Sequence, residues 1–245
     1  RQALMDADAA GKPTSLVLGL LGGMGPAATL DCLTKLQAFT PAASDQDHIR
    51  VIADINPKVP DRNVPGSGAG PILAEMAGAL RGAGADVLAI ACNTAHAHAD
   101  LIQRASGLPL IDMIETGALA ARDTGARRAG VLGTKGALRL YREYLAAQAM
   151  GMVTLEPVRQ DDFMATLYKI KGGDTGPAIR REMAGYAADL IGGGAEAIIA
   201  GCTEVPLVLG PTDLRVAFID PGELLAKRCV AVCLGLEAIP ALPGS

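Results

Sequence analysis

The chain has 245 residues, of which 50% are hydrophobic and 20% are charged, a composition typical of a globular protein with a sizeable core. Its 22 basic and 26 acidic side chains give a formal charge of -4, and only 3% of residues are aromatic, which argues against nucleic acid or an anionic membrane as the partner. The 30 Gly and 15 Pro are scattered and the apolar content is high, which excludes collagen, coiled-coil and disordered classes.

Short apolar runs alternate along the chain with longer stretches of helical spacing. The runs of strand length are 16–21, 51–55, 87–91, 108–111, 129–132, 197–200 and 216–219, and two of the helical stretches, 72–84 and 178–193, end in Gly. Continuous apolar strands separated by helices are typical of a parallel sheet that is covered on both faces. The sequence therefore predicts an α/β, doubly wound fold.

Two motifs occur twice in the chain at one common spacing. Residues 19–25 align with 130–136, and residues 84–94 align with 194–204, at offsets of 111 and 110 positions. A shared register for two separate motifs indicates an internal repeat. We infer two similar doubly wound parallel-sheet lobes related by a pseudo-two-fold axis, with the active site in the cleft between them. Residues 1–114 plus 215–245 would form the first lobe, with the C-terminal helix returning to it, and residues 115–214 the second.

The repeat aligns two of the five cysteines. Cys92 and Cys202 each stand where a predicted strand ends and a polar turn begins, at the edge of a parallel sheet where ligands bind. We therefore expect one thiol from each lobe to face the cleft. Cys32, Cys229 and Cys233 are interpreted as buried packing residues. Residues 1–8 lack the basic-then-apolar order of a secretory signal, so reduced thiols and a cytoplasmic location are expected.

Metal and nucleotide sites are weaker interpretations of the same segments. Cys92, His96 and His98 are close in sequence, but two histidines two positions apart on a helix face different directions, and no CxxC or HExxH pattern occurs. The glycine-rich loop 23–28 fits a loose dinucleotide fingerprint, but Pro26 removes a backbone N–H that a pyrophosphate would need. No metal and no cofactor are expected, and the loop is interpreted as a close backbone approach to a small carboxylate.

A thiol on each face of a chiral carbon suits a two-base racemase. One thiolate removes the α-proton and the opposite thiol delivers a proton to the other face. Asn93, Thr94 and Thr203 directly follow the thiols and offer hydrogen-bond donors, while Glu204 can orient Cys202 or accept its proton.

Four motifs then place the chain by resemblance. Residues 21–26 (LGGMGP), 56–62 (NPKVPDR), 91–96 (ACNTAH) and 201–206 (GCTEVP) are similar to those of the aspartate/glutamate racemase superfamily, and the resemblance covers residues 16 to about 234. The chain most closely resembles the aspartate racemase branch of these pyridoxal-phosphate-independent enzymes. The glutamate racemase branch usually has an Asp-Ser pair in the first loop and a His after the second Cys-Thr, where this chain has Gly-Gly-Met and Glu204.

The resemblance implies residue roles. Cys92 and Cys202 would be the catalytic pair, with Cys202 acting on the L form and Cys92 on the D form. Arg62 would bind one substrate carboxylate and Lys171 a second. Lys169 is the alternative to Lys171 for the second carboxylate. The remaining expected pocket residues are Met24, Asn93, Thr94, Thr134 and Thr203, supported by Asn56 and Glu204. The expected partner is a small amino acid, aspartate before glutamate, and a homodimer is compatible with the family.

Arg62 and Lys171 would lie on two chain segments that cover the cleft, one from each lobe. Residues 57–71 predict a glycine-rich lid loop that carries Arg62, and residues 160–176 predict its counterpart in the other lobe. Three alternatives stay open: a racemase of neutral or several amino acids, a single-thiol isomerase such as a maleate isomerase-like enzyme, and a non-catalytic binding protein with the same two lobes.

Overall fold

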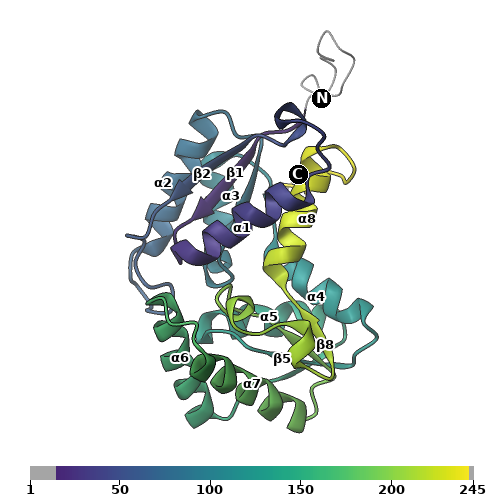
Figure 1. Cartoon of the computed structure of the whole chain (residues 1–245). Coiled ribbons are helices and arrows are strands. Elements are labelled where there is room, and N and C mark those ends of the chain that lie inside the picture. The colour runs from purple at the N-terminus through teal and green to yellow at the C-terminus, as the bar shows by residue number, and fades with distance from the viewer. Residues whose placement is uncertain (1–14, 243–245) are drawn as a thin grey trace.

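The computed structural model describes residues 15–242, so the features expected at residues 1–8 lie outside the described residues. Figure 1 shows two α/β lobes, one above the other, with the last helix running back from the second lobe to the first. Within the described range, no helix is both long and apolar enough to cross a membrane.

The first lobe is built on a four-stranded parallel sheet. Its strand order is β2-β1-β3-β4, and Leu18 of β1 is in register with Val51 of β2 on one side and Val87 of β3 on the other. The strands are β1 (Leu18–Gly22), β2 (Val51–Ile55), β3 (Val87–Ile90) and β4 (Leu110–Ile111). Both central strands are fully buried, which explains their continuous apolar sequences.

The second lobe repeats this arrangement. Its sheet has the order β6-β5-β7-β8, again with all pairs parallel, so β5 takes the place of β1 and β7 the place of β3. The strands are β5 (Arg128–Val131), β6 (Gly151–Val153), β7 (Ala197–Ile199) and β8 (Ala217–Ile219). The predicted α/β fold of two similar parallel-sheet lobes is confirmed.

Helices cover both faces of each sheet. In the first lobe, α1 and α8 pack on one face and α2 and α3 on the other; in the second, α4 and α5 pack on one face and α6 and α7 on the other. The helices are α1 (Pro26–Phe39), α2 (Ala69–Gly82), α3 (Ala99–Ser106), α4 (Met113–Asp123), α5 (Lys135–Ala147), α6 (Pro157–Lys171), α7 (Pro177–Gly192) and α8 (Pro221–Cys233). Cys32, Cys229 and Cys233 lie in the core between α1 and α8.

Two segments of the second lobe differ from the prediction. Strand β6 was not predicted, and residues 160–176, expected as a lid segment like 57–71, are mostly the helix α6. The helix begins at Pro157, and Gln160, Phe163, Leu167 and Ile170 form its buried stripe. Residues 40–50 connect α1 to β2, whereas only residues 148–150 connect α5 to β6, so the repeat loses its register at this point.

The lobe boundaries follow the packing of the connecting elements. Strand β8 is hydrogen-bonded to β7 in the second sheet, whereas α8 packs against α1 in the first lobe. The predicted boundary after residue 214 therefore precedes a strand of the second sheet. We propose that the second lobe runs from α4 through β8 and that the chain then returns to the first lobe as α8.

Candidate active site

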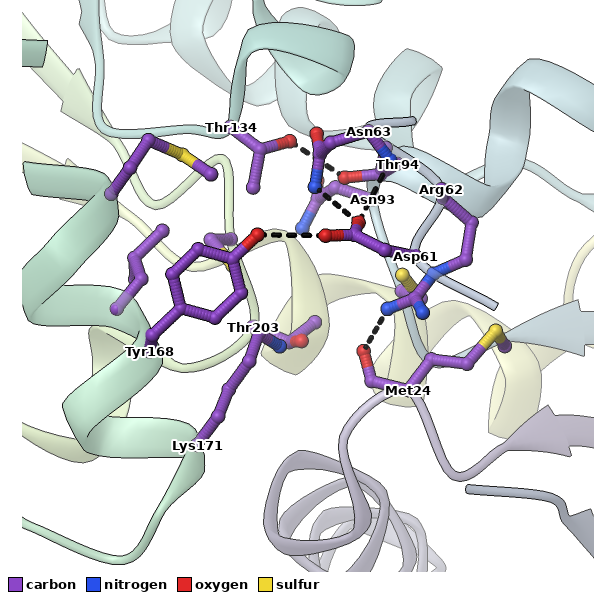
Figure 2. Close-up of a pocket in the computed structure, with 14 residues that line it drawn as sticks. Met24, Asp61, Arg62, Asn63, Asn93, Thr94, Thr134, Tyr168, Lys171 and Thr203 are labelled. Carbon is purple, nitrogen blue, oxygen red and sulfur yellow. Dashed lines mark hydrogen bonds between the residues drawn. The ribbon is translucent and has the colours of Figure 1, made fainter. Parts of the chain in front are cut away.

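A cavity of about 160 Å³ lies between the lobes at the carboxyl ends of the central strands. Figure 2 shows Met24 and Arg62 on one side of it and Tyr168 and Lys171 of α6 on the other. The lining residues are Met24, Asp61, Arg62, Asn63, Cys92, Asn93, Thr94, Thr134, Met164, Leu167, Tyr168, Lys171, Cys202 and Thr203. This set includes all nine residues predicted for catalysis or substrate binding.

Cys92 follows the buried strand β3 and is 5% exposed. A buried histidine one turn further on fixes this strand end. Nε2 of His96 accepts a hydrogen bond from the backbone N–H of Met113, so Nδ1 carries the proton and donates it to the carbonyl of Cys92, 2.9 Å away. Both ring nitrogens of His96 are thus engaged in holding Cys92 against the start of α4.

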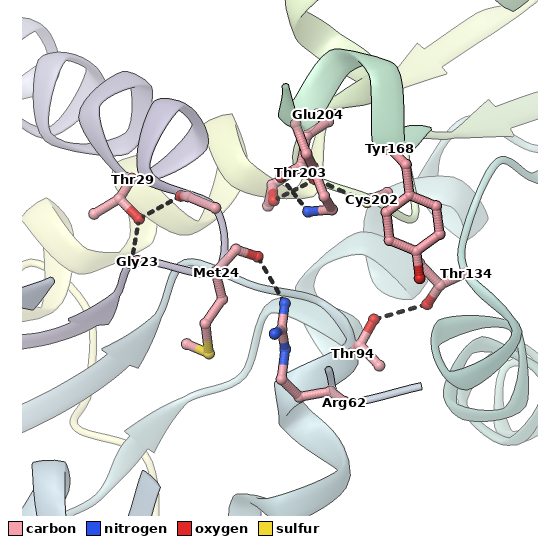
Figure 3. A network of polar contacts seen from close by, with 12 residues as sticks. Gly23, Met24, Thr29, Arg62, Thr94, Thr134, Tyr168, Cys202, Thr203 and Glu204 are labelled. Carbon is pink, nitrogen blue, oxygen red and sulfur yellow. Dashed lines mark hydrogen bonds and ion pairs between the residues drawn. The ribbon is translucent and has the colours of Figure 1, made fainter. Parts of the chain in front are cut away.

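Cys202 occupies the matching place after β7 and is 6% exposed. Its thiol donates a hydrogen bond to Oε2 of Glu204 at 2.9 Å (Figure 3). Burial, and next the charge of Glu204, raise the pKa of the Cys202 thiol well above its ordinary value, and the nearby ammonium of Lys171 opposes this only in part. Cys202 is therefore a protonated thiol at neutral pH.

Glu204 lies behind the pocket wall and is only 2% exposed. Its Oε1 accepts a hydrogen bond from the ammonium of Lys171 at 2.5 Å, and its Oε2 accepts from Cys202 and, at 3.4 Å, from Thr203. A buried carboxylate needs such partners because desolvation otherwise disfavours its charge. Glu204 therefore contacts both the Cys202 thiol and the Lys171 ammonium, and its supporting role stays a prediction.

Lys171 is the last residue of α6 and its side chain is 26% exposed. Burial alone would lower its pKa, but the neighbouring Cys202 and Glu204 raise the pKa of Lys171 above its ordinary value, so the ammonium stays charged. The sequence assigned Lys171 to a substrate carboxylate. In the structure this residue lines the cavity and is already paired with a carboxylate of the protein.

Arg62 reaches the cavity from the loop between β2 and α2. Its Nη2 donates to the carbonyl of Met24 at 3.1 Å, and its Nη1 donates to the carbonyl of Pro60 at 3.1 Å and more weakly to that of Val59. The buried Nε of Arg62 has no hydrogen-bond partner among the described residues. Three backbone carbonyls thus hold the guanidinium, and its Nε edge is left to donate elsewhere.

The loop that places Met24 depends on a close backbone approach. Gly23 has φ of 92°, and a Cβ at this position would lie 2.5 Å from the backbone of Asn56. The side chain of Asn56 accepts from the backbone N–H of Lys58 and does not line the cavity. Asn56 thus lies at the start of the loop that carries Arg62, and its supporting role stays a prediction.

Hydrogen bonds between the lobes surround the cavity. Thr94 Oγ1 lies 2.7 Å from Thr134 Oγ1, which also caps α5 by accepting from the N–H of Ala137. Tyr141 of α5 donates to Asn93 Oδ1 at 2.7 Å. Gly136 lies where a Cβ would come 2.7 Å from Thr94. The lobes are thus in direct contact beside the strand-end thiol of Cys92.

Several lining residues were not predicted from the sequence. Tyr168 of α6 donates to Oδ2 of Asp61 at 2.7 Å, which joins the two covers over the cavity (Figure 2). Burial opposes ionisation of Asp61, but hydrogen bonds from Asn63 and Tyr168 hold its pKa below the ordinary value. Met164 and Leu167 add an apolar wall. Asp61 adjoins Arg62 in the 56–62 motif, whereas the α6 residues become visible only once 157–171 is recognised as a helix.

Among the described residues, no group of three or more His, Cys, Asp or Glu side chains is arranged to hold a metal ion. His98 is partly buried, and burial lowers its pKa. The chemistry available at the cavity is thus that of two thiols, two cations, two carboxylates and a set of hydroxyl and amide groups.

Comparisons with known proteins agree with this geometry. A family model described as Asp/Glu/hydantoin racemase matches residues 21–229. A broad-specificity amino-acid racemase of Bacillus subtilis is 25% identical over 91% of this chain and 100% of its own length. A glutamate racemase of Pseudomonas entomophila is 33% identical over 64% of this chain and 61% of its own length. The structure of an aspartate racemase of Picrophilus torridus is similar with a TM-score of 0.76 at 25% identity, covering 90% of this chain and 94% of that one.

Proposed function

Because the chain belongs to the Asp/Glu/hydantoin racemase family, we propose that it racemises an amino acid without a cofactor, with the thiols of Cys92 and Cys202 as the acid and the base. The observation that carries the proposal is that both strand-end thiols, one from each lobe, line a single cavity of about 160 Å³. A base on each side of the α-carbon is what inversion by proton transfer requires.

Substrate binding begins at the α-carboxylate. Arg62 and Asn93 both line the cavity, and the buried Nε of Arg62 and Nδ2 of Asn93 have no hydrogen-bond partner among the described residues. Both atoms donate hydrogen bonds, so a carboxylate would satisfy them. The same donors would meet the greater charge on these oxygens when the α-carbon loses its proton, which stabilises the enediolate more than the substrate.

Proton transfer then runs between the thiols and the α-carbon. In one direction the Cys92 thiolate takes the α-proton and the Cys202 thiol gives its proton to the opposite face, leaving Cys92 as a thiol and Cys202 as a thiolate. In the other direction the roles exchange. The raised pKa of Cys202 keeps it ready as an acid, and Lys171 offers a positive charge to the thiolate that forms. The second direction needs Cys202 as a thiolate before substrate binds. Glu204 can accept the Cys202 proton in the free enzyme and so form this thiolate.

The covers of the cavity support this chemistry by excluding water. Asp61 and Tyr168 join the Arg62 loop to α6, and Thr94 joins Thr134 across the lobes. In a closed site the charges and hydrogen bonds act with less screening by water. The weak acidity of an α-proton beside a carboxylate makes such stabilisation necessary.

For the substrate we propose aspartate. Arg62 would hold the α-carboxylate and Lys171 the side-chain carboxylate, because an ammonium has three donors and Glu204 takes one of them. The similarity to an aspartate racemase structure at 25% identity supports the same choice.

A second candidate is a racemase of broader specificity. The Lys171–Glu204 ion pair favours it, because Lys171 does not need a substrate carboxylate to balance its charge. The apolar side chains of Met164 and Leu167 at the cavity would accept an uncharged side chain. The likeness to a broad-specificity amino-acid racemase along 91% of the chain points the same way.

The test is the loss of optical rotation of L-aspartate, L-glutamate and L-alanine solutions without added cofactor. Racemisation of any of them supports the proposed activity, and the ranking separates the two substrate candidates. Arg62→Leu should lower kcat/KM for every substrate. No racemisation across a full panel of amino acids by the folded protein would overturn the proposal.

A further inference from the structure

The side-chain amide of Asn93 is held in one orientation by a residue of the other lobe. Asn93 follows Cys92 in the first lobe and is 2% exposed. Its Oδ1 accepts a hydrogen bond from the phenol of Tyr141 at 2.7 Å, while its Nδ2 has no partner among the described residues. Tyr141 lies on α5 of the second lobe and is fully buried.

The chemistry of the pair decides which end of the amide faces the cavity. A phenol hydroxyl buried in a protein needs an acceptor for its proton, and Asn93 Oδ1 is the acceptor that Tyr141 has. Burial, reinforced by the charges of Asp112 and Asp220, raises the pKa of Tyr141 well above its ordinary value, so the phenol keeps its proton. With the oxygen engaged, the NH₂ group of Asn93 is the end left for the cavity.

The Tyr141 side chain is closely packed on the way to its contact with Asn93. A Cβ at Gly117 of α4 would lie 3.0 Å from the Tyr141 hydroxyl, so the absence of a side chain there allows the phenol to reach Asn93. The ring itself is packed in the core between α4, α5 and the second sheet. The ring of Tyr141 thus lies in the core of the second lobe, and its hydroxyl reaches Asn93 at the active-site edge of the first lobe.

We infer that Tyr141 is a positioning residue which fixes the Asn93 amide as a hydrogen-bond donor to the substrate α-carboxylate. The inference rests on the proposed racemase function and deepens it. Without the phenol, the amide can rotate and present its carbonyl oxygen to the carboxylate, which replaces an attraction by a repulsion. Because the two residues belong to different lobes, the donor is set only when the lobes are together.

A double-mutant cycle tests whether Tyr141 acts through Asn93. Racemisation kinetics are measured for the wild type, Tyr141→Phe, Asn93→Ala and the double variant. We expect Tyr141→Phe to lower kcat/KM about 10- to 100-fold, the range for losing an oriented hydrogen bond to a charged group. The loss should fall mainly on kcat, because the donor interacts most strongly with the enediolate. In the Asn93→Ala background, Tyr141→Phe should cost less than about twofold.

Tyr144→Phe is the matched control. Tyr144 is on the same helix and donates to Asp112 at 2.7 Å, away from the cavity, so its loss should leave kcat/KM within about twofold of the wild type. Equal losses from Tyr141→Phe with and without Asn93 would show a purely structural effect and overturn the inference. So would an unchanged kcat/KM in Tyr141→Phe.

A second variant covers the case in which Tyr141→Phe does not fold. Asn93→Asp keeps an acceptor for Tyr141 and exchanges the donor at the cavity for a second acceptor, so we expect at least about a 100-fold loss of kcat/KM. Near wild-type activity would overturn the inference. Failure of the proposed function is recognised separately, because the wild type would then not racemise amino acids, or Cys92→Ala would racemise them as well as the wild type does. An active wild type, an inactive Cys92→Ala and a fully active Tyr141→Phe together contradict only the role of Tyr141.

Discussion

The ammonium of Lys171 lies 2.5 Å from Oε1 of Glu204, and this contact ties the end of α6 to the turn that carries Cys202. Glu204 also accepts the hydrogen bond of the Cys202 thiol. One carboxylate therefore couples the candidate substrate cation to one of the two candidate catalytic thiols. Changes at Lys171 will affect both substrate choice and thiol chemistry, and the two effects have to be separated.

The contribution of Lys171 to substrate choice is best measured in a Glu204→Gln background. Adding Lys171→Met there leaves no buried unpaired carboxylate, and its remaining effect on the Cys202 thiolate is common to all substrates, so a comparison of two substrates isolates contact with the side-chain carboxylate. If Lys171 binds the side-chain carboxylate, kcat/KM for aspartate should fall about 10- to 100-fold more than kcat/KM for alanine.

Lys169→Met is the matched control for this experiment. Lys169 lies two residues earlier on α6, and its exposed ammonium is 3.7 Å from Glu182, outside the cavity. The variant should leave both substrates unaffected. Equal losses for aspartate and alanine on adding Lys171→Met would contradict aspartate recognition and favour the broader substrate range.

The charge of Glu204 should be visible in the titration of Cys202. Because Glu204 raises the pKa of this thiol and Lys171 lowers it, Glu204→Gln is expected to shift the pKa of Cys202 downward. Thiolate absorbance near 240 nm in a Cys92→Ala background would report the shift. The buried thiols of Cys32 and Cys233, whose pKa values are raised to about 12, are common to the proteins with and without Glu204→Gln, so their absorbance cancels in the difference. An unchanged or raised pKa of Cys202 would contradict the proposed coupling.

The contact between Asp61 and Tyr168 should stabilise the closed covers. Tyr168→Phe removes the 2.7 Å hydrogen bond without changing a charge. Because both residues are partly exposed, we expect a moderate effect, a rise in KM of about 3- to 10-fold for every substrate with a smaller change in kcat. Steady-state kinetics at fixed pH check this, and an unchanged KM would show that this bond does not contribute to closure.

The buried cysteines of the first lobe should make the protein less stable at alkaline pH. Burial, assisted by the charge of Asp31, raises the pKa of Cys32 from 9.0 to about 12. Between these values the unfolded chain loses the proton and the folded chain keeps it, so the free energy of unfolding falls as pH rises. The contribution of protonated Cys32 to the free energy of unfolding is complete below pH 9 and is lost as pH rises towards 12.

Cys32→Ala tests this dependence. Urea unfolding under reducing conditions between pH 9.5 and 11 should show a slope that is shallower than in the wild type by about 1.4 kcal/mol per pH unit, one proton's contribution. The cavity left by the substitution lowers stability at every pH and so does not alter the slope. Parallel pH profiles for the two proteins would contradict the raised pKa of Cys32.

Much of the fold was predictable because its signals are local. Runs such as 87–91 and 197–200 are apolar throughout since the central strands of a covered parallel sheet are buried on both faces, and the repeat of Cys92 at Cys202 revealed two lobes and a shared cleft. Strand β6 was missed because it has three residues and follows a connection much shorter than its counterpart in the first lobe.

The parts of the site that the sequence did not give depend on contacts between distant segments. Tyr168 meets Asp61, and Tyr141 meets Asn93, only after the lobes come together, and neither tyrosine belongs to a repeated motif. The pairing of Lys171 with Glu204 also depends on where α6 ends relative to β7. Spacing along a chain predicts which residues lie at a strand end, but not which side chain of the other lobe faces them.

The most direct test of the two-thiol account is exchange of the substrate α-proton in deuterated water by single cysteine variants, followed by NMR. Cys92→Ala and Cys202→Ala should each fail to racemise, because each keeps a base on one face only. Each should still exchange the α-proton of one enantiomer with retention, the L form for Cys92→Ala and the D form for Cys202→Ala. Continued racemisation by either variant would contradict the account.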